Sequence, residues 1–98
     1  MPETLDAATV ATRLSEVDGW TGDTKGITRT AELPSFPAAI DVVTKVAAVA
    51  EELDHHPDID IRWRTLTFAV STHSAGGVTA KDFDLAARID QVINAAKP

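Results

Sequence analysis

The sequence predicts an α+β domain in the order α-ββ-α-ββ-α, with a four-stranded antiparallel sheet and helices packed on one of its faces. Three segments carry apolar residues at helical spacing, and two pairs of segments alternate apolar and polar residues across a short turn. Consecutive hairpins separated by helices are typical of an antiparallel sheet covered on one side. At 98 residues and 44% hydrophobic content, the chain is sufficient for a single domain over residues 1–98.

The first predicted helix covers about residues 4–16. Its apolar residues recur at three-residue spacing: Leu5, Ala8, Ala11 and Leu14. Asp18-Gly19 ends this helix, and Trp20 begins a short extended segment. Residues 23–26 (DTKG) have the Asp and Gly of a tight turn, and apolar and polar residues alternate over residues 27–33. These two segments predict the first hairpin.

A second helix is predicted to begin within residues 34–37 (PSFP), with Ser35 or Phe36 at its cap and Pro37 in its first turn, where a missing N–H costs nothing. It should run to about Leu53 and end before Pro57, because a proline disfavours helical geometry in the residue before it. Its expected buried stripe consists of Ile40, Val43, Val46 or Ala47, Ala50 and Leu53.

The second hairpin is predicted because apolar and polar residues alternate over residues 59–63 and again over residues 66–70. The apolar residues fall on odd-numbered positions in the first segment and on even-numbered positions in the second. A two-residue turn at Arg64-Thr65 explains the change, although Arg-Thr is a poor sequence for such a turn. The expected cross-strand pairs are Trp63 with Leu66, Ile61 with Phe68, and Ile59 with Val70, all on one face.

Residues 79–82 (TAKD) predict the start of the third helix, because they resemble a capping box with Asp82 in place of glutamate. A glycine-containing loop, Ala75-Gly76-Gly77, precedes it. The expected buried stripe of this helix consists of Phe83, Ala86, Ile89, Val92 or Ile93, and Ala96.

Composition narrows the class of function. The formal charge is −6 and no cluster of Lys and Arg is present, so we expect no nucleic-acid binding through phosphates. The chain has no cysteine, which excludes disulfides and thiolate metal ligands. Residues 1–11 lack the basic start and apolar run of a secretory signal, and the apolar residues 38–50 are interrupted by polar ones. We therefore expect a cytoplasmic protein that does not enter a membrane.

All three histidines, His55, His56 and His73, lie between Glu51 and Asp82. His55 and His56 follow the second helix, and His56 precedes a proline, so their side chains should point in different directions. His73 follows the fourth predicted strand, which an antiparallel hairpin returns to the start of the third. The three imidazoles can therefore converge at one end of the sheet.

Other interpretations of these residues remain open at this point. A single histidine at the end of an element is usually solvated or a cap, whereas three in one predicted pocket favour a functional site. A three-histidine zinc site is an alternative, although adjacent histidines on an extended backbone would need distortion to share one metal. Asp82 has a structural role as a helix cap, Trp63 could be a core residue, and Glu51 could be a surface acid.

The spacing Glu51-x3-His55-His56-Pro57-x5-Trp63-x9-His73-x8-Asp82 resembles that of the pterin-4a-carbinolamine dehydratases, also called 4a-hydroxytetrahydrobiopterin dehydratases. Gly19-Trp20, Phe36-x2-Ala39 and the glycine pair before the third helix are also similar to the family. The resemblance covers about residues 5–96, and the family's fold of a sheet packed against helices agrees with the predicted element order.

The resemblance implies elimination of water from a 4a-hydroxytetrahydropterin to give the quinonoid dihydropterin, in tetrahydrobiopterin recycling and without a metal or organic cofactor. His55 and His73 are the expected acid–base pair, and His56 is expected to hold the pterin. The same resemblance implies supporting roles at the pocket for Glu51, Asp54, Trp63, Ser71, Thr72 and Asp82.

Oligomerisation is also expected, because a four-stranded sheet has two open edges and because the family forms dimers and tetramers. The resemblance further implies a functional link to a pterin-dependent aromatic amino acid hydroxylase. Some relatives are instead non-catalytic, serving as a dimerisation cofactor of a transcription factor or as an assembly chaperone. The assembly chaperones have lost parts of the motif. The motif is present here, which favours the enzyme, although a second role alongside catalysis would leave it intact.

Overall fold

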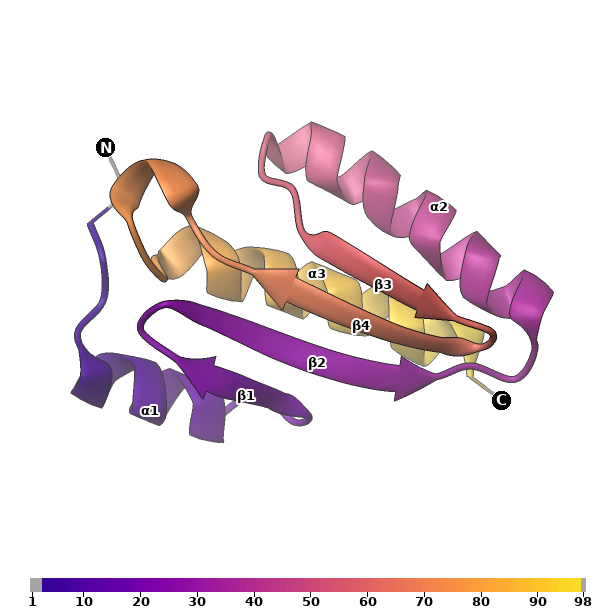
Figure 1. Cartoon of the computed structure of the whole chain (residues 1–98), viewed down its shortest axis with the longest axis horizontal. Helices are drawn as coiled ribbons and strands as arrows, with labels where there is room; N and C mark the ends of the chain where they lie inside the picture. The colour runs from indigo at the N-terminus through magenta and orange to yellow at the C-terminus, as the bar shows by residue number, and fades with distance from the viewer. Residues whose placement is uncertain (1–2, 98) are drawn as a thin grey trace.

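A computed structural model describes residues 3–97 of the chain. Within this range it contains three α-helices and one four-stranded antiparallel sheet, which confirms the predicted α+β class (Figure 1). In chain order the elements are α1 (Ala7–Ser15), β1 (Trp20–Asp23), β2 (Gly26–Glu32), α2 (Phe36–Leu53), β3 (Asp58–Arg62), β4 (Thr65–Val70), the 3₁₀ turn η1 (His73–Ala75) and α3 (Ala80–Ala96). The strand order across the sheet is β1-β2-β4-β3. No helix among residues 3–97 is long and apolar enough to span a membrane.

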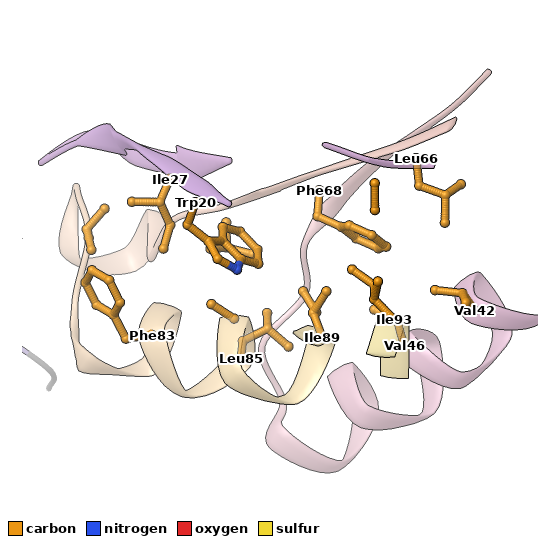
Figure 2. Close-up of a cluster of buried hydrophobic side chains, with 14 of the residues drawn as sticks. Trp20, Ile27, Val42, Val46, Leu66, Phe68, Phe83, Leu85, Ile89 and Ile93 are labelled. Atoms are coloured by element: carbon orange, nitrogen blue, oxygen red, sulfur yellow. The ribbon is translucent and has the colours of Figure 1, made fainter. Parts of the chain in front are cut away.

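The hydrophobic core lies between the sheet and the helices. Figure 2 shows Phe68 of β4 directed toward Ile89 of α3. Burial alternates along β4, where Leu66, Phe68 and Val70 are buried and face the helices. Asp90 of α3 accepts hydrogen bonds from the Trp20 indole, at 2.8 Å, and from the Arg29 guanidinium, which ties the sheet to this helix.

Side-chain caps define the beginnings of the helices. Asp6 caps α1, and hydrogen bonds with the backbone N–H and the side chain of Thr9 lower the pKa of Asp6. Ser35 caps α2 by accepting a hydrogen bond of 3.2 Å from the N–H of Ala38, and Pro37 lies in the first turn, as predicted. The helix ends at Leu53, also as predicted.

The predicted buried face of α2 was wrong in part. Ile40 is 39% exposed, whereas the buried residues of the helix are Ala39, Val42, Val46 and Ala50. Residues 38–50 are so rich in apolar side chains that more than one helical stripe can be drawn through them. Packing of α2 against α3 and the sheet selects one of these stripes, which periodicity cannot do.

The predicted pairing of β3 with β4 was also wrong. Arg62 pairs with Thr65, Ile61 with Leu66 and Ile59 with Phe68, so the turn consists of Trp63 and Arg64. A shift of two residues leaves every side chain on its original face, and alternation therefore cannot reveal it. Thr65 pairs with Glu32 of β2, which places it within the sheet and moves the turn back by one residue.

Phe68→Ala should lower the free energy of unfolding by about 3–5 kcal/mol, because it removes a fully buried ring at the centre of the core. Thr28→Ala is the control, since Thr28 is exposed on the outer face of β2 and truncation to alanine there should have a much smaller effect. Urea unfolding measures both. Equal losses in the two variants would contradict this description of the core.

Candidate active site

The three histidines surround one hollow at the end of the molecule where α2 ends, β4 ends and α3 begins. It has a volume of about 230 Å³. Its lining residues come from the segments that follow α2 and β4: Asp54, His55, His56, Ser71, Thr72, His73 and Ser74. The two segments are nearly twenty residues apart in the chain. They meet because β3 and β4 are antiparallel, which brings the end of β4 beside the start of β3.

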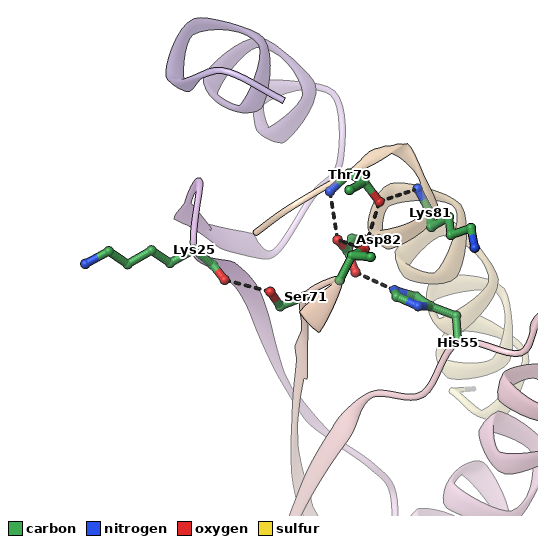
Figure 3. A network of polar contacts seen from close by, with 7 residues as sticks. Lys25, His55, Ser71, Thr79, Lys81 and Asp82 are labelled. Carbon is green, nitrogen blue, oxygen red and sulfur yellow. Dashed lines mark hydrogen bonds and ion pairs between the residues drawn. The ribbon is translucent and has the colours of Figure 1, made fainter. Parts of the chain in front are cut away.

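His55 is held by a buried carboxylate. Its Nε2 lies 2.6 Å from Oδ1 of Asp82, whose side chain has 0% exposure, while the His55 side chain is 11% exposed (Figure 3). The other carboxylate oxygen, Oδ2, accepts hydrogen bonds from the backbone N–H of Thr79, at 2.9 Å, and from the hydroxyl of Thr72, at 2.8 Å. Asp82 is thus both the acid of the α3 capping box and the partner of His55.

The end of α2 separates the two adjacent histidines. Asp54 adopts the left-handed conformation, with φ of +50°, and the N–H of His55 bonds the carbonyl of Ala50 at 3.0 Å. His55 is thereby turned toward α3, whereas the exposed His56 contacts the carboxylate of Glu51. Glu51 therefore pairs with His56. It does not pair with His55, although His55 follows it by four residues in the chain.

The glycine pair positions His73. Thr72 and Gly77 exchange backbone hydrogen bonds of 3.1 and 3.3 Å, which close the loop that begins with His73. Gly76 has φ of +81°, and a Cβ at Gly77 would lie 2.7 Å from the carbonyl oxygen of Thr24. Both positions therefore require glycine, and the loop presents His73 at the border of the hollow.

A second hollow, of about 380 Å³, adjoins the first and shares Ser71 and His73 with it. Lys25, from the β1–β2 turn, and Asp58, the first residue of β3, also line it. The hydroxyl of Ser71 donates a hydrogen bond of 2.8 Å to the carbonyl of Lys25. Lys25 and Asp58 were not identified from the sequence, because neither belongs to a motif and only the sheet brings them beside His73.

Trp63 lies far from the histidines. It occupies the β3–β4 turn, with φ of +54° and 70% exposure, and the Arg64 guanidinium lies 4.8 Å from its ring. The hairpin places this turn at the opposite end of β4 from His73 (Figure 1). The structure therefore assembles the other predicted site residues without Trp63, which is neither a wall of the hollow nor a core residue.

Among residues 3–97, no three His, Asp or Glu side chains are arranged to hold one metal ion. His55 and His56 contact different carboxylates, those of Asp82 and Glu51. What the hollow does offer is three imidazoles, two of them with carboxylate partners, and several hydroxyls. Imidazoles titrate near neutrality and can both donate and accept protons, so this set of groups suits acid–base chemistry on a small polar ligand.

Comparison with known proteins identifies the family of this chain. The family model described as pterin 4 alpha carbinolamine dehydratase matches residues 3–92. The chain belongs to this family. A protein of Roseiflexus castenholzii that bears the family name provisionally is 54% identical over 93 residues, covering 95% of this chain and 100% of its own length. A Nocardia farcinica protein with the same provisional name is 53% identical over 90 residues, covering 92% of this chain and 95% of its own.

Two solved structures of other proteins have the same fold as this member of the pterin-4a-carbinolamine dehydratase family. A transcriptional coactivator/pterin dehydratase from Brucella melitensis superposes with a TM-score of 0.89 at 28% identity, over 93% of this chain and 99% of that one. A pterin dehydratase-like RuBisCO assembly factor of the α-carboxysome superposes with a TM-score of 0.63 at 19% identity, over 76% of this chain and 86% of that one. The second likeness is one of fold alone.

Asp82→Ala should lower the free energy of unfolding by about 2–4 kcal/mol, because it removes the acid of the α3 capping box and leaves buried donors on Thr72 and Thr79 without an acceptor. Asp84→Ala is the control, since Asp84 is exposed on the same helix and its loss should cost less than about 1 kcal/mol. Denaturant unfolding compares the two variants. A loss no larger at Asp82 than at Asp84 would contradict the assigned hydrogen bonds.

Proposed function

We propose that this protein eliminates water from 4a-hydroxytetrahydrobiopterin, or a related 4a-hydroxytetrahydropterin, to give the quinonoid dihydropterin. One observation carries the proposal within the family: His55, held by the buried Asp82, and His73 border the same hollow. The two adjoining hollows, of about 230 and 380 Å³, together offer the volume of a typical small-molecule site.

The reaction needs one proton donor and one proton acceptor. The C4a hydroxyl leaves as water when an acid protonates it, and a base removes the proton of a ring nitrogen as the double bond forms. Imidazoles can do both near neutral pH. His55 and His73 are the proposed pair, because they come from different segments of the chain and line the same hollow. The proposed mechanism uses side chains alone, with no metal or organic cofactor.

The remaining residues of the hollow are proposed to bind or orient the pterin. His56, exposed beside Glu51, is proposed to contact the pterin ring at the mouth of the hollow. Asp54 and Ser71 line the same hollow and offer oxygen atoms to the amino and amide groups of a pterin, whereas Thr72 borders the hollow with its hydroxyl bonded to Asp82. A pterin-dependent aromatic hydroxylase is the proposed source of the substrate, since such enzymes leave the hydroxyl on C4a.

His55→Ala and His73→Ala should each lower kcat by roughly 10²–10⁴-fold, as expected for loss of an acid–base group. His56→Ala should act mainly on KM. The measurement is the rate of dehydration of a freshly generated 4a-hydroxytetrahydropterin, with Arg62→Ala, exposed on the outer sheet face, as the control variant. A wild-type protein that gives no acceleration over buffer would refute the function, and a fully active His73→Ala would refute the pair.

A second proposal concerns interaction with other chains. Among residues 3–97, four large apolar side chains are exposed: Phe36, Ile40, Ile61 and Trp63. Phe36 and Ile40 belong to the first turns of α2, and Ile61 and Trp63 to the end of β3 and its turn. Figure 1 places the start of α2 and this turn at the same end of the molecule, opposite the end of α2 and the end of β4, after which the histidines come. We propose a homodimer or homotetramer that uses this end and the open edge of β3.

The oligomer should be detectable by light scattering after size-exclusion chromatography. Ile61→Lys should shift the population toward the monomer, because a charge on the edge strand opposes pairing of apolar edges. Thr28→Lys, on the exposed outer face of β2, is the matched control and should leave the mass unchanged. A wild-type monomer at micromolar concentration would contradict the proposed assembly. A purely non-catalytic interaction protein would instead assemble normally and show no dehydration activity.

A further inference from the structure

Asp82 is bonded to a series of hydroxyl groups that reaches beyond the hollow. The Oγ1 atoms of Thr72 and Thr79 lie 2.8 Å apart, and both side chains are buried. Thr79 Oγ1 also accepts a hydrogen bond of 3.2 Å from the N–H of Lys81, in the first turn of α3 (Figure 3). The series of hydrogen bonds therefore runs from the start of the helix through Thr79 and Thr72 to Asp82 and ends at His55.

The direction of each hydrogen bond follows from the number of protons. A threonine hydroxyl carries one proton, and that of Thr72 is donated to Oδ2 of Asp82. Thr72 can therefore only accept from Thr79, whose own oxygen accepts from Lys81. The Lys81 N–H, the Thr79 hydroxyl and the Thr72 hydroxyl therefore all donate in the direction of Asp82. The Thr79 N–H is a further donor to the same oxygen, so Oδ2 is occupied by two donors, as suits an ionised carboxylate.

This direction has a consequence for His55. An ionised carboxylate is an acceptor only, so the ring nitrogen 2.6 Å from Oδ1 must carry a proton. A neutral imidazole carries one proton, and when that proton is on Nε2 the other nitrogen, Nδ1, is an acceptor. His55 lines the hollow, and Nδ1 is then its only ring nitrogen that can accept a proton.

We propose that Thr72 and Thr79 are positioning residues that set the tautomer of His55. Their hydroxyls hold the Asp82 carboxylate so that it receives the Nε2 proton and leaves Nδ1 as the proton acceptor. The catalytic consequence rests on the proposed dehydratase function, in which His55 would take the proton of the pterin ring nitrogen. The structural part of the proposal does not depend on that function.

Thr72→Val tests this series of hydrogen bonds with little change of shape. It removes the hydroxyl that donates to Asp82 and leaves the Thr79 hydroxyl without its acceptor, so Oδ2 keeps only the Thr79 N–H as a donor and the carboxylate is held less firmly. Nitrogen-15 NMR of the imidazole rings, at a pH where His55 is neutral and with no substrate present, reports the tautomer. Wild type should show a single form protonated on Nε2, and Thr72→Val should show a mixture with the Nδ1–H form.

Kinetics supply the second readout. Thr72→Val should lower kcat by about tenfold, the equivalent of about 1.4 kcal/mol, with KM changed by less than about twofold. Thr72→Ser keeps the hydroxyl and should restore both the tautomer and kcat. Thr67→Val is the matched control, because Thr67 and Thr30 form an Oγ1–Oγ1 contact of 3.0 Å on the exposed sheet face, with no carboxylate attached. It should leave both readouts at wild-type values.

The outcomes separate the two proposals. A wild-type protein without dehydratase activity would overturn the proposed function, and the NMR comparison would still decide whether the threonines set the tautomer. An unchanged Nε2–H signal and full kcat in Thr72→Val would overturn the positioning role. If Thr72→Val does not fold, Thr72→Ala and Thr79→Ser replace it. The first should give the mixed tautomer, and the second should keep the wild-type form.

Discussion

The buried carboxylate of Asp82 connects the fold of this protein to its candidate site. A charged group with no solvent contact is stable only when its oxygens are fully bonded, and here two donors and an imidazole surround it. The start of α3 supplies one donor and the segment after β4 supplies another. The residue after the α2 cap supplies the imidazole. Three elements therefore meet at one side chain, and its burial requires all three in register.

The end of the molecule that carries the histidines is polar, whereas the core is apolar. The strands and helices are held by apolar contacts such as those of Phe68 and Ile89. Their ends carry the hydrogen-bonding groups, with His55 at the end of a helix and His73 after the end of a strand. Groups at such ends can face a ligand without breaking the hydrogen bonds of a helix or the sheet.

The opposite end of the molecule has a different character. Trp63 and Ile61 expose apolar surface where the β3–β4 hairpin turns, and Trp63 adopts a left-handed conformation that bulky residues rarely take. Motif spacing assigned Trp63 to the pocket, but the hairpin separates it from His73 by the full length of β4. Spacing along the chain does not distinguish the two ends of a strand, whereas the direction of the strand does.

Local chemistry in the sequence was enough to determine the α+β class, the limits of α2 and the capping box at Thr79 and Asp82, because propensity, capping and proline geometry act over a few residues. It also predicted that the three histidines lie close together. Only the tertiary structure decided the pairing of β3 with β4, the buried face of α2 and the carboxylate partners of His55 and His56. These features depend on packing between distant segments: a two-residue shift keeps the same alternation, and an apolar helix offers several equivalent stripes. The dual role of Asp82, as helix cap and histidine partner, likewise exists only once α2 and α3 lie together.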